Sequence, residues 1–456
     1  MTRPRAWRQR AVALSLAWAG AMACAQQPPP ALPAASASAP ASPSAQRLYE
    51  RARSQLLQVR TLLKGQDSQA SVGSGFVVGE DGLIITNYHV VSQVALQPER
   101  YRLTYTRVDG REGALQLLGF DAVHDLAVVK ALPVSGRGKA GAGPVAAGTP
   151  LEFRPASTPL SQGERIYSLG NPLDVGFAVL EGTYNGLVER SFYPSIFFAG
   201  SLNSGMSGGP ALDEQGRVVG INVATRRDGQ QVSFLVPAAF AQALLERSRR
   251  AAPITAPVYP ELTTQLLAHQ ELVTQRFVAQ PWRSAGHARY LIPVPQEDFM
   301  RCWGRSTPAD TKGLEFERSD CEMDTQVFVS GALLTGSLGV RHETYDGRKL
   351  GGLRFTQRHS ASFRNESFGR RNPKEFTAPQ CSERFVEQGG LPLRAVLCLT
   401  AYRRLTGLYD LSVLAATVDQ GSIGAQGRLD ARGVSFDNAM RLATHYLLGY
   451  GLKEQP

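Results

Sequence analysis

Three residue types that can perform nucleophilic catalysis together occur in one order along the chain. His89 follows an apolar run, Asp125 precedes another, and Ser207 lies among glycines. A serine hydroxyl is a weak nucleophile at neutral pH, so a neutral histidine has to take its proton during attack and return it to the leaving group. A carboxylate has to fix the imidazole tautomer. The sequence therefore predicts Ser207 as the nucleophile, His89 as the general base and Asp125 as the orienting carboxylate.

The glycines around Ser207 predict a second catalytic device. Gly205 allows the backbone to turn so that its own N–H and that of Ser207 point at one spot. Such a spot holds the oxyanion of a tetrahedral intermediate, and one donor is worth about 3–4 kcal/mol of activation barrier. Gly208 and Gly209 allow close packing behind the nucleophile.

His124, directly before Asp125, is an alternative base. Neighbouring residues of a strand point to opposite faces. If the Asp125 side chain points into the catalytic cleft, the His124 side chain points away from it. We therefore expect no catalytic role for His124.

Short apolar runs between Gly and Asn turns must position these residues. Such runs occupy six places: residues 75–78, 83–86, 126–129, 165–169, 217–221 and 233–236. Many short strands at close spacing predict an antiparallel barrel or sandwich. A helix is expected before this region, from about Gln46 to Leu56, and another after it, from about Pro237 to Arg247.

Residues 55–245 resemble the protease domain of the HtrA/Deg family of trypsin-like serine proteases. The matching stretches are GSGFVV at 73–78, TNYHVV at 86–91, HDLAVVK at 124–130, LGNP at 169–172, GMSGGP at 205–210, GIN at 220–222 and FLVP at 234–237. The resemblance implies a mostly β protein with two six-stranded barrels, His89 and Asp125 on the first and Ser207 on the second. It also implies a serine endopeptidase that acts on proteins or peptides through an acyl-enzyme, without a metal or organic cofactor. Members of the family often form oligomers, so a homo-oligomer is a further expectation.

By the same resemblance, the residues just before the nucleophile line the primary specificity pocket. Ser201 and Leu202 occupy these positions, and neither is acidic, so Arg or Lys is not expected at the cleaved position. Leu202 should shorten the pocket and favour small aliphatic residues. Four further residues are expected at the rim and wall of the pocket: Val223, Ala224, Thr225 and Val232.

The chain departs from the family pattern in two places near the nucleophile. The family often has a Thr-Asp pair where this chain has Ala199 and Gly200, and it commonly has Asn at the position of Met206. Both differences concern the loop that would hold the oxyanion, and both leave the reacting groups in place.

The first 25 residues are typical of an export signal. Four arginines lie within the first ten residues, and an apolar run extends from Ala11 to about Cys24, with small residues at a cleavage site. The run is shorter than the about 20 residues of a spanning helix. We therefore expect a periplasmic or secreted protein. Lipidation of Cys24 is an alternative that would anchor it to a membrane.

Composition predicts two folded domains in the 456 residues. The formal net charge is +10, but the arginines are scattered and form no basic stripe with interleaved aromatics, so nucleic-acid binding is not expected. The predicted organisation is a signal peptide at 1–25, a Pro/Ala/Ser-rich linker at 26–45, the protease domain at 46–248, a linker at 249–257 and an α+β domain at 258–456.

The C-terminal domain is expected to contain disulfides and two helices, from Pro260 to Phe277 and from Phe436 to Leu448. It holds all the cysteines except Cys24: Cys302, Cys321, Cys381 and Cys398. An even number in an exported chain favours two disulfides. Three pairings are possible, and 302–321 with 381–398 is the simplest because each closes a short loop. No pair has the close spacing of a structural zinc site.

Three functions stay open from the sequence. The complete triad favours an active endopeptidase. Ala199, Gly200 and the unassigned C-terminal domain leave room for a protease-fold scaffold, weakly active or inactive, whose C-terminal domain binds an envelope protein. An esterase with the same triad is a third alternative, but a strand follows Ser207 where an esterase has a helix.

Overall fold

A computed structural model of the protein describes residues 41–132, 149–225, 232–308, 313–363 and 372–453. Ala41–Pro456 forms one compact unit. The predicted signal peptide, Cys24 and the linker up to residue 40 lie outside the described residues.

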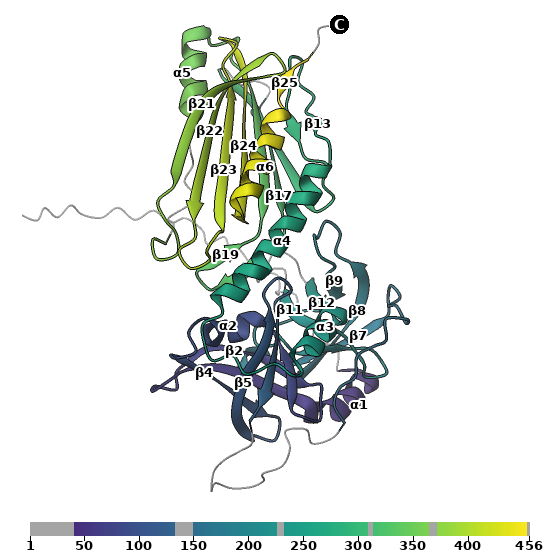
Figure 1. The fold of residues 1–456 in the computed structure, drawn as a ribbon. Coiled ribbons are helices and arrows are strands. Elements are labelled where there is room, and N and C mark those ends of the chain that lie inside the picture. Colours follow the sequence, from purple (N-terminus) through teal and green to yellow (C-terminus); the bar gives the residue numbers. More distant parts are fainter. Residues whose placement is uncertain (1–40, 133–148, 226–231, 309–312, 364–371, 454–456) are drawn as a thin grey trace, which may run out of the picture. The chain divides into compact units, whose positions relative to one another are not determined.

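Two closed six-stranded barrels occupy the region predicted to be β-rich, and they confirm the expected fold class (Figure 1). The strands of the first barrel, in spatial order, are β1 (Leu56–Leu63), β2 (Gln69–Val77), β3 (Leu83–Thr86), β6 (Leu126–Ala131), β5 (Glu112–Asp121) and β4 (Tyr101–Arg107). Those of the second are β10 (Pro210–Leu212), β11 (Val218–Thr225), β12 (Ser233–Pro237), β9 (Ile196–Ala199), β8 (Ala178–Leu187) and β7 (Arg165–Gly170). Neighbouring strands pair antiparallel, as short strands with tight turns predict.

Three helices accompany the barrels. α1 (Pro43–Ala52) is capped by Ser42, whose hydroxyl accepts from the backbone N–H of Ala45. It begins inside the segment that the composition predicted to be a linker, and it ends before Leu56. α3 (Ala238–Ser248) lies where a helix was expected, whereas α2 (Tyr88–Leu96) was not anticipated. α2 begins at the residue before His89 and buries most of its side chains in the first barrel.

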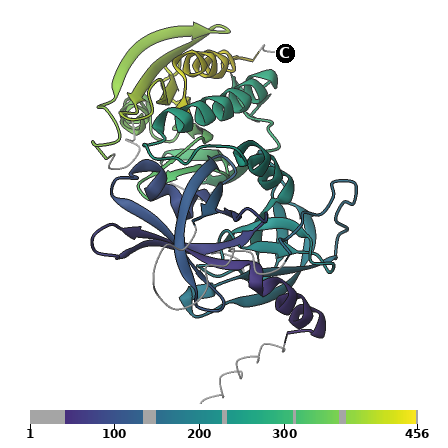
Figure 2. The same ribbon diagram turned by 60° about the horizontal axis from the view of Figure 1, so that its bottom comes forward.

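A seven-stranded antiparallel sheet forms the centre of the C-terminal region. Its strands, in spatial order, are β16 (Met300–Ser306), β17 (Glu315–Met323), β20 (Leu338–Asp346), β24 (Ile423–Val434), β23 (Tyr409–Thr417), β22 (Leu391–Ala401) and β21 (Gln380–Gln388). Helices α4 (Tyr259–Ala279) and α6 (Phe436–Leu448) lie side by side on one face (Figures 1 and 2). α5 (Gly352–Ser362) lies on the other face, where the Gln426 amide donates to the His359 carbonyl. These observations confirm the α+β domain and both helices expected there.

Smaller strand pairs complete this region. They are β13 (Arg283–Ser284) with β15 (Pro293–Val294), β14 (Tyr290–Leu291) with β25 (Gly451–Leu452), and the hairpin β18 (Val327–Ser330) with β19 (Leu333–Thr335). In the described part of the chain, no helix combines the length and apolar character that a membrane crossing requires.

Both edges of the seven-stranded sheet carry a disulfide. Cys302–Cys321 joins β16 to β17, and Cys381–Cys398 joins β21 to β22. This is the simplest of the three possible pairings. Each disulfide therefore fastens an edge strand to its inner neighbour.

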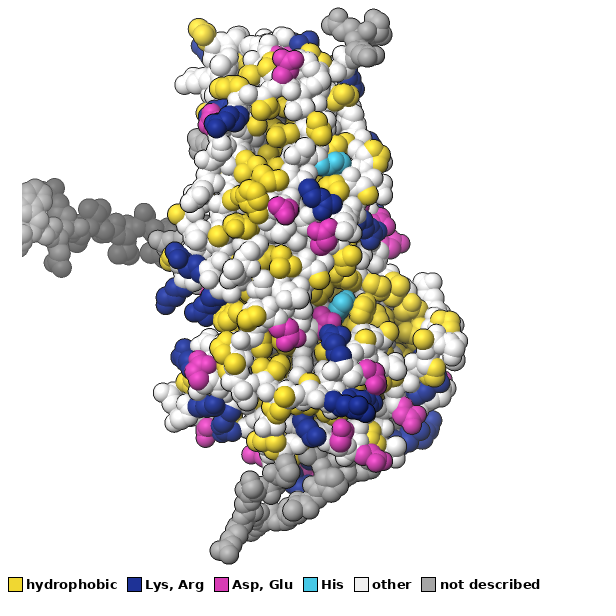
Figure 3. Space-filling view, viewed as in Figure 1, with side chains coloured by type: hydrophobic (Ala, Val, Ile, Leu, Met, Phe, Trp, Pro, Cys, Tyr) yellow, Lys and Arg dark blue, Asp and Glu magenta, His cyan; other side chains and the backbone are white. Residues whose placement is uncertain are grey.

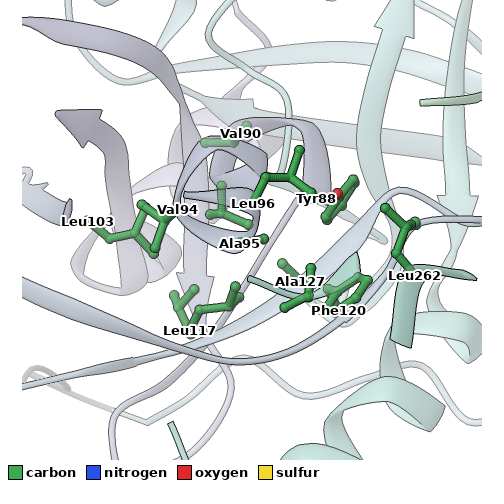
Figure 4. Packing of buried hydrophobic residues seen from close by; sticks show 14 of the residues in the cluster. Tyr88, Val90, Val94, Ala95, Leu96, Leu103, Leu117, Phe120, Ala127 and Leu262 are labelled. Atoms are coloured by element: carbon green, nitrogen blue, oxygen red, sulfur yellow. The ribbon is translucent and has the colours of Figure 1, made fainter. Parts of the chain in front are cut away.

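The hydrophobic cluster of the first barrel continues into the C-terminal region. Tyr88, Phe120 and Ala127 of the barrel share one buried cluster with Leu262 of α4, and the close view shows Leu262 at its margin (Figure 4). Val327 and other residues of the β18–β19 hairpin belong to the same cluster. The domain boundaries at residues 248 and 258 remain a prediction. The hydrophobic cluster contains residues from both sides of them.

Charges of both signs are interspersed on the molecular face shown in Figure 3. This face carries no large area of a single charge sign. Among the described residues, ion pairs include Arg102 with Asp67 and Arg165 with Glu181.

Candidate active site

The His89 ring is fixed by the Asp125 carboxylate from two sides. His89 Nδ1 lies 2.6 Å from Asp125 Oδ2, and the backbone N–H of His89 donates to Oδ1 at 2.8 Å. Asp125 lies in the turn between β5 and β6 with a φ of 54°, and the Asn87 amide donates to its carbonyl at 2.7 Å. A carboxylate on Nδ1 keeps a proton there and leaves Nε2 free to act as a base.

Burial and the Asp125 charge act on His89 in opposite directions. Burial by itself lowers the pKa of an imidazole, because the charged form is harder to solvate. The Asp125 carboxylate, through its charge and its hydrogen bond, outweighs burial and raises the pKa of His89 above its usual 6.5. The ring therefore binds a proton more readily than a free imidazole does, which suits a general base.

Ser207 lies on the second barrel, directly before β10. Its hydroxyl donates to the backbone carbonyl of Val223 on β11 at 3.0 Å. Within the described ranges, no hydrogen bond joins Ser207 Oγ to His89. Attack would therefore first require rotation of the Ser207 hydroxyl away from Val223 and toward the imidazole.

The backbone N–H groups of Gly205 and Ser207, predicted to form an oxyanion hole, differ from those of their neighbours. The amides of Met206, Gly208 and Gly209 each donate to a backbone carbonyl. Those of Gly205 and Ser207 donate to no protein acceptor in the part of the chain that is described. Gly205 has a φ of +92°, and a Cβ at this position would lie 2.4 Å from the Asn171 carbonyl oxygen. Glycine is therefore required here by both conformation and space.

Ser74 of the first barrel holds the loop that carries these amides. Its hydroxyl donates to the Gly205 carbonyl at 2.7 Å and accepts from the Asn171 N–H at 2.9 Å. Its own N–H donates to the Ser207 carbonyl at 2.7 Å. Ser74 is buried, so these bonds form away from water and join the two barrels at Ser207.

Asn222 supports the same loop from the second barrel. Its amide donates to the carbonyls of Leu169 and Met206, and its oxygen accepts from the Ser168 hydroxyl. Sequence reasoning placed Ser74 and Asn222 in matching stretches but assigned them no role. Their partners are distant in the sequence, so spacing along the chain could not reveal them.

The predicted specificity residues lie in different environments. Ser201 is exposed, whereas Leu202 is 7% exposed and packs in the core of the second barrel with Phe198 and Met206. Val223 and Val232 are half-buried. Ala224 and Thr225 belong to β11, but their side chains lie outside the described residues. The role of all six in substrate choice remains a prediction.

The position of His124 does not follow from the alternation of side chains in a strand, which the sequence analysis assumed. It lies in the same turn as Asp125, not in a strand, so the alternation argument was wrong. Its Nδ1 pairs with Asp121 Oδ2 at 2.9 Å, and its ring stacks on Phe240 with centroids 3.9 Å apart. These contacts engage the ring outside the His89–Asp125 pair.

Comparison with known proteins identifies the barrel region. Residues 73–221 match the family described as trypsin-like peptidase domain. A protein from Hahella chejuensis named as a DegP-like periplasmic serine endoprotease is 33% identical over 185 residues, which cover 38% of this chain and 34% of that protein. A Synechocystis protein named as serine protease HhoA is 34% identical over 206 residues, which cover 43% of this chain and 47% of that protein. Residues 73–221 belong to an HtrA-like, trypsin-like peptidase domain.

This HtrA-like domain accounts for only part of the chain. The matched region covers 34% and 47% of the two relatives' own lengths, less than half of either. A crystal structure of a serine endoprotease from Yersinia pestis is 23% identical, covers 46% of this chain and 68% of that one, and aligns with a TM-score of 0.37. The HtrA-like domain confirms the resemblance predicted from the sequence.

Proposed function

We propose that the protein is a serine endopeptidase that uses Ser207, His89 and Asp125. The observation that carries the proposal is the pairing of His89 with Asp125, together with the amides of Gly205 and Ser207, which have no protein acceptor among the described residues. A binding scaffold needs neither a tuned imidazole nor free N–H groups at a serine.

The proposed reaction has two halves. The Ser207 hydroxyl rotates toward His89, loses its proton to Nε2 and attacks the peptide carbonyl, whose oxyanion accepts from the amides of Gly205 and Ser207. The C–N bond then breaks as His89 returns the proton to the leaving amine, which leaves an acyl ester on Ser207. Water activated by His89 hydrolyses this ester and restores the serine.

The proposed substrates are unfolded or envelope proteins outside the cytoplasm. Export is inferred from residues 1–25, and one relative is named as a periplasmic endoprotease. Ser201 and Leu202 support a preference for small aliphatic residues at the cleaved position, with Val223, Ala224, Thr225 and Val232 around it. Lipidation at Cys24 and assembly into homo-oligomers remain predictions.

The deciding experiment is cleavage of casein by the chain starting at Gln26, with Ser207→Ala as its control. We expect the wild type to produce fragments and the variant to lose roughly 10⁶-fold in kcat, because the acyl-enzyme cannot form. Residues at the fragment ends report the pocket preference. Cleavage by the Ser207→Ala variant at the wild-type rate would contradict the proposal.

The hydrogen bond from Ser207 to Val223 favours one second candidate, a gated or inactive scaffold. A serine-directed phosphonate distinguishes the two if casein is not cleaved. Labelling of Ser207 would identify a competent enzyme that is gated in isolation. No labelling would favour a scaffold whose C-terminal region binds an envelope protein.

A further inference from the structure

The β18–β19 hairpin of the C-terminal region has one buried face and one outer face. Val327, Val329 and Leu333 are 2–5% exposed and belong to the hydrophobic cluster of the first barrel. Phe328 and Leu334, which alternate with these residues, are direct cross-strand partners. Phe328 also packs against the edge of the same cluster, where its ring meets that of Tyr88 with centroids 6.4 Å apart. Phe328 is half-buried and Leu334 is 48% exposed.

The hairpin is held against the residue that precedes the candidate base. The Tyr88 hydroxyl donates to the Val329 carbonyl at 3.2 Å, and Tyr88 is buried. Just beyond the hairpin, the Gly336 carbonyl lies 2.9 Å from His269 Nε2 of α4. These contacts fix the hairpin at two points, so its outer face has a defined position beside His89.

The Phe328 ring lies next to the catalytic imidazole. The two ring centroids are 6.1 Å apart, and the planes meet at 74°, an edge-to-face arrangement. Leu334, the cross-strand partner of Phe328, adds a half-exposed apolar side chain beside it. We call the two residues, Phe328 and Leu334, the apolar ledge.

A polypeptide substrate must pass this ledge. Its scissile carbonyl has to reach Ser207 while His89 stays within proton-transfer distance, so a side chain next to the cleaved residue lies against the imidazole. The imidazole and the Phe328 ring would then contact that side chain together. An apolar side chain would bury its surface there without leaving a polar group buried and without a hydrogen-bond partner.

We propose that the apolar ledge is a substrate subsite, supplied by the C-terminal region, that selects an apolar residue beside the scissile bond. Phe328 and Leu334 are thus specificity-determining residues outside the HtrA-like domain. This inference rests on the proposed endopeptidase function, because it concerns the substrate of the same site.

The test compares Phe328→Ala and Leu334→Ala with two matched controls far from the ledge in the sequence. Phe385→Ala removes a ring that is 72% exposed on edge strand β21, and Leu353→Ala removes a side chain that is 91% exposed on α5. Each full-length variant cleaves a peptide library that varies the positions on both sides of the scissile bond. A small serine reagent, diisopropyl fluorophosphate, measures the reactivity of Ser207 independently of the subsite.

We expect wild type to prefer apolar residues at one position adjacent to the cleaved residue. Phe328→Ala should lower kcat/KM for those peptides roughly tenfold, and for peptides with glycine at that position by less than about twofold. Leu334→Ala should act in the same direction with a smaller effect. Because Leu334 is half-exposed, this variant still tests the ledge if Phe328→Ala misfolds. Both controls should keep the wild-type profile, and all variants should react with the fluorophosphate at the wild-type rate.

Three results would overturn the inference. An unchanged cleavage profile in both ledge variants would show that no substrate side chain contacts the ledge. Equal losses for all peptides, with slower fluorophosphate labelling, would show that Phe328 only supports His89. If wild type cleaves no peptide and does not react with the reagent, the proposed endopeptidase function fails first, and the ledge then has no substrate to select.

Discussion

At the scale of single residues, Asp125 is the group on which the behaviour of His89 depends. Its two oxygens engage the ring and the backbone of His89, so it sets both orientation and charge. Removing the charge while keeping the shape separates the two effects. Asp125→Asn does this, because asparagine is nearly isosteric with aspartate.

Asp125→Asn should lower kcat by about 10⁴-fold, because the amide favours the wrong imidazole tautomer. The same substitution should also shift the pH dependence of kcat/KM. Activity needs neutral His89, so kcat/KM rises with pH through the pKa of His89, which Asp125 holds above 6.5. Without the carboxylate, burial dominates and the pKa falls, so the acidic limb of the pH profile of kcat/KM shifts to lower pH.

Asp121→Asn is the matched control, since Asp121 pairs with His124 and not with His89. The acidic limb of the pH profile of kcat/KM of this variant should coincide with that of wild type. A limb that moves as far in Asp121→Asn as in Asp125→Asn would contradict the assignment of Asp125 as the orienting carboxylate.

At the scale of elements, a disulfide joins each edge strand of the C-terminal sheet to its inner neighbour. The disulfides join β16 to β17 and β21 to β22, with sequence separations of 19 and 17 residues. Cross-links over loops of this length stabilise by about 3 kcal/mol, chiefly by restricting the unfolded chain.

Replacing Cys381 and Cys398 together by serine should therefore lower the free energy of unfolding of the sheet by about 3 kcal/mol. Urea denaturation followed by far-UV circular dichroism measures the change. In the same variant, fluorophosphate labelling of Ser207 in the absence of denaturant should stay at the wild-type rate, because residues 46–248 contain no cysteine. Equal stability of the variant and oxidised wild type would refute the stabilising role.

At the scale of the whole molecule, the first barrel and helix α4 share one hydrophobic cluster. Leu262 is fully buried in that cluster, whereas Leu272 on the same helix is 51% exposed. The two leucines thus form a natural pair for testing how far the barrel depends on the C-terminal region.

Leu262→Ala should destabilise the protein by about 2–5 kcal/mol, because it removes a buried side chain and leaves a cavity. Leu272→Ala should change stability by less than about 0.5 kcal/mol. Thermal unfolding and the loss of fluorophosphate labelling on heating should shift together in Leu262→Ala, since the cluster includes α2, which carries His89. Two variants with the same unfolding temperature would mean that the barrel does not rely on α4.

The sequence by itself determined the residues that are proposed to react and most of the elements that hold them. Short apolar runs bounded by Gly and Asn turns predicted β3, β6, β7 and β12. Apolar residues on one helical face predicted α4, and Gly449 marked the end of α6. The short helix α2 was missed because its apolar residues, at 90–91 and 94–96, lie within a stretch whose short apolar runs all suggested strands. The triad order was readable because each member lies in a distinctive local stretch.

Only the tertiary structure decided how distant segments meet at the site. Ser74 contacts Gly205 across 131 residues, and Tyr88 contacts Val329 across 241. Such contacts depend on how barrels, helices and the hairpin pack, and packing leaves no periodic trace along the chain. The sequence therefore determined which groups are proposed to react. The folded molecule decided three further features: the amides of Gly205 and Ser207 without a protein acceptor among the described residues, the hydrogen bond from Ser207 to Val223, and the ledge beside His89.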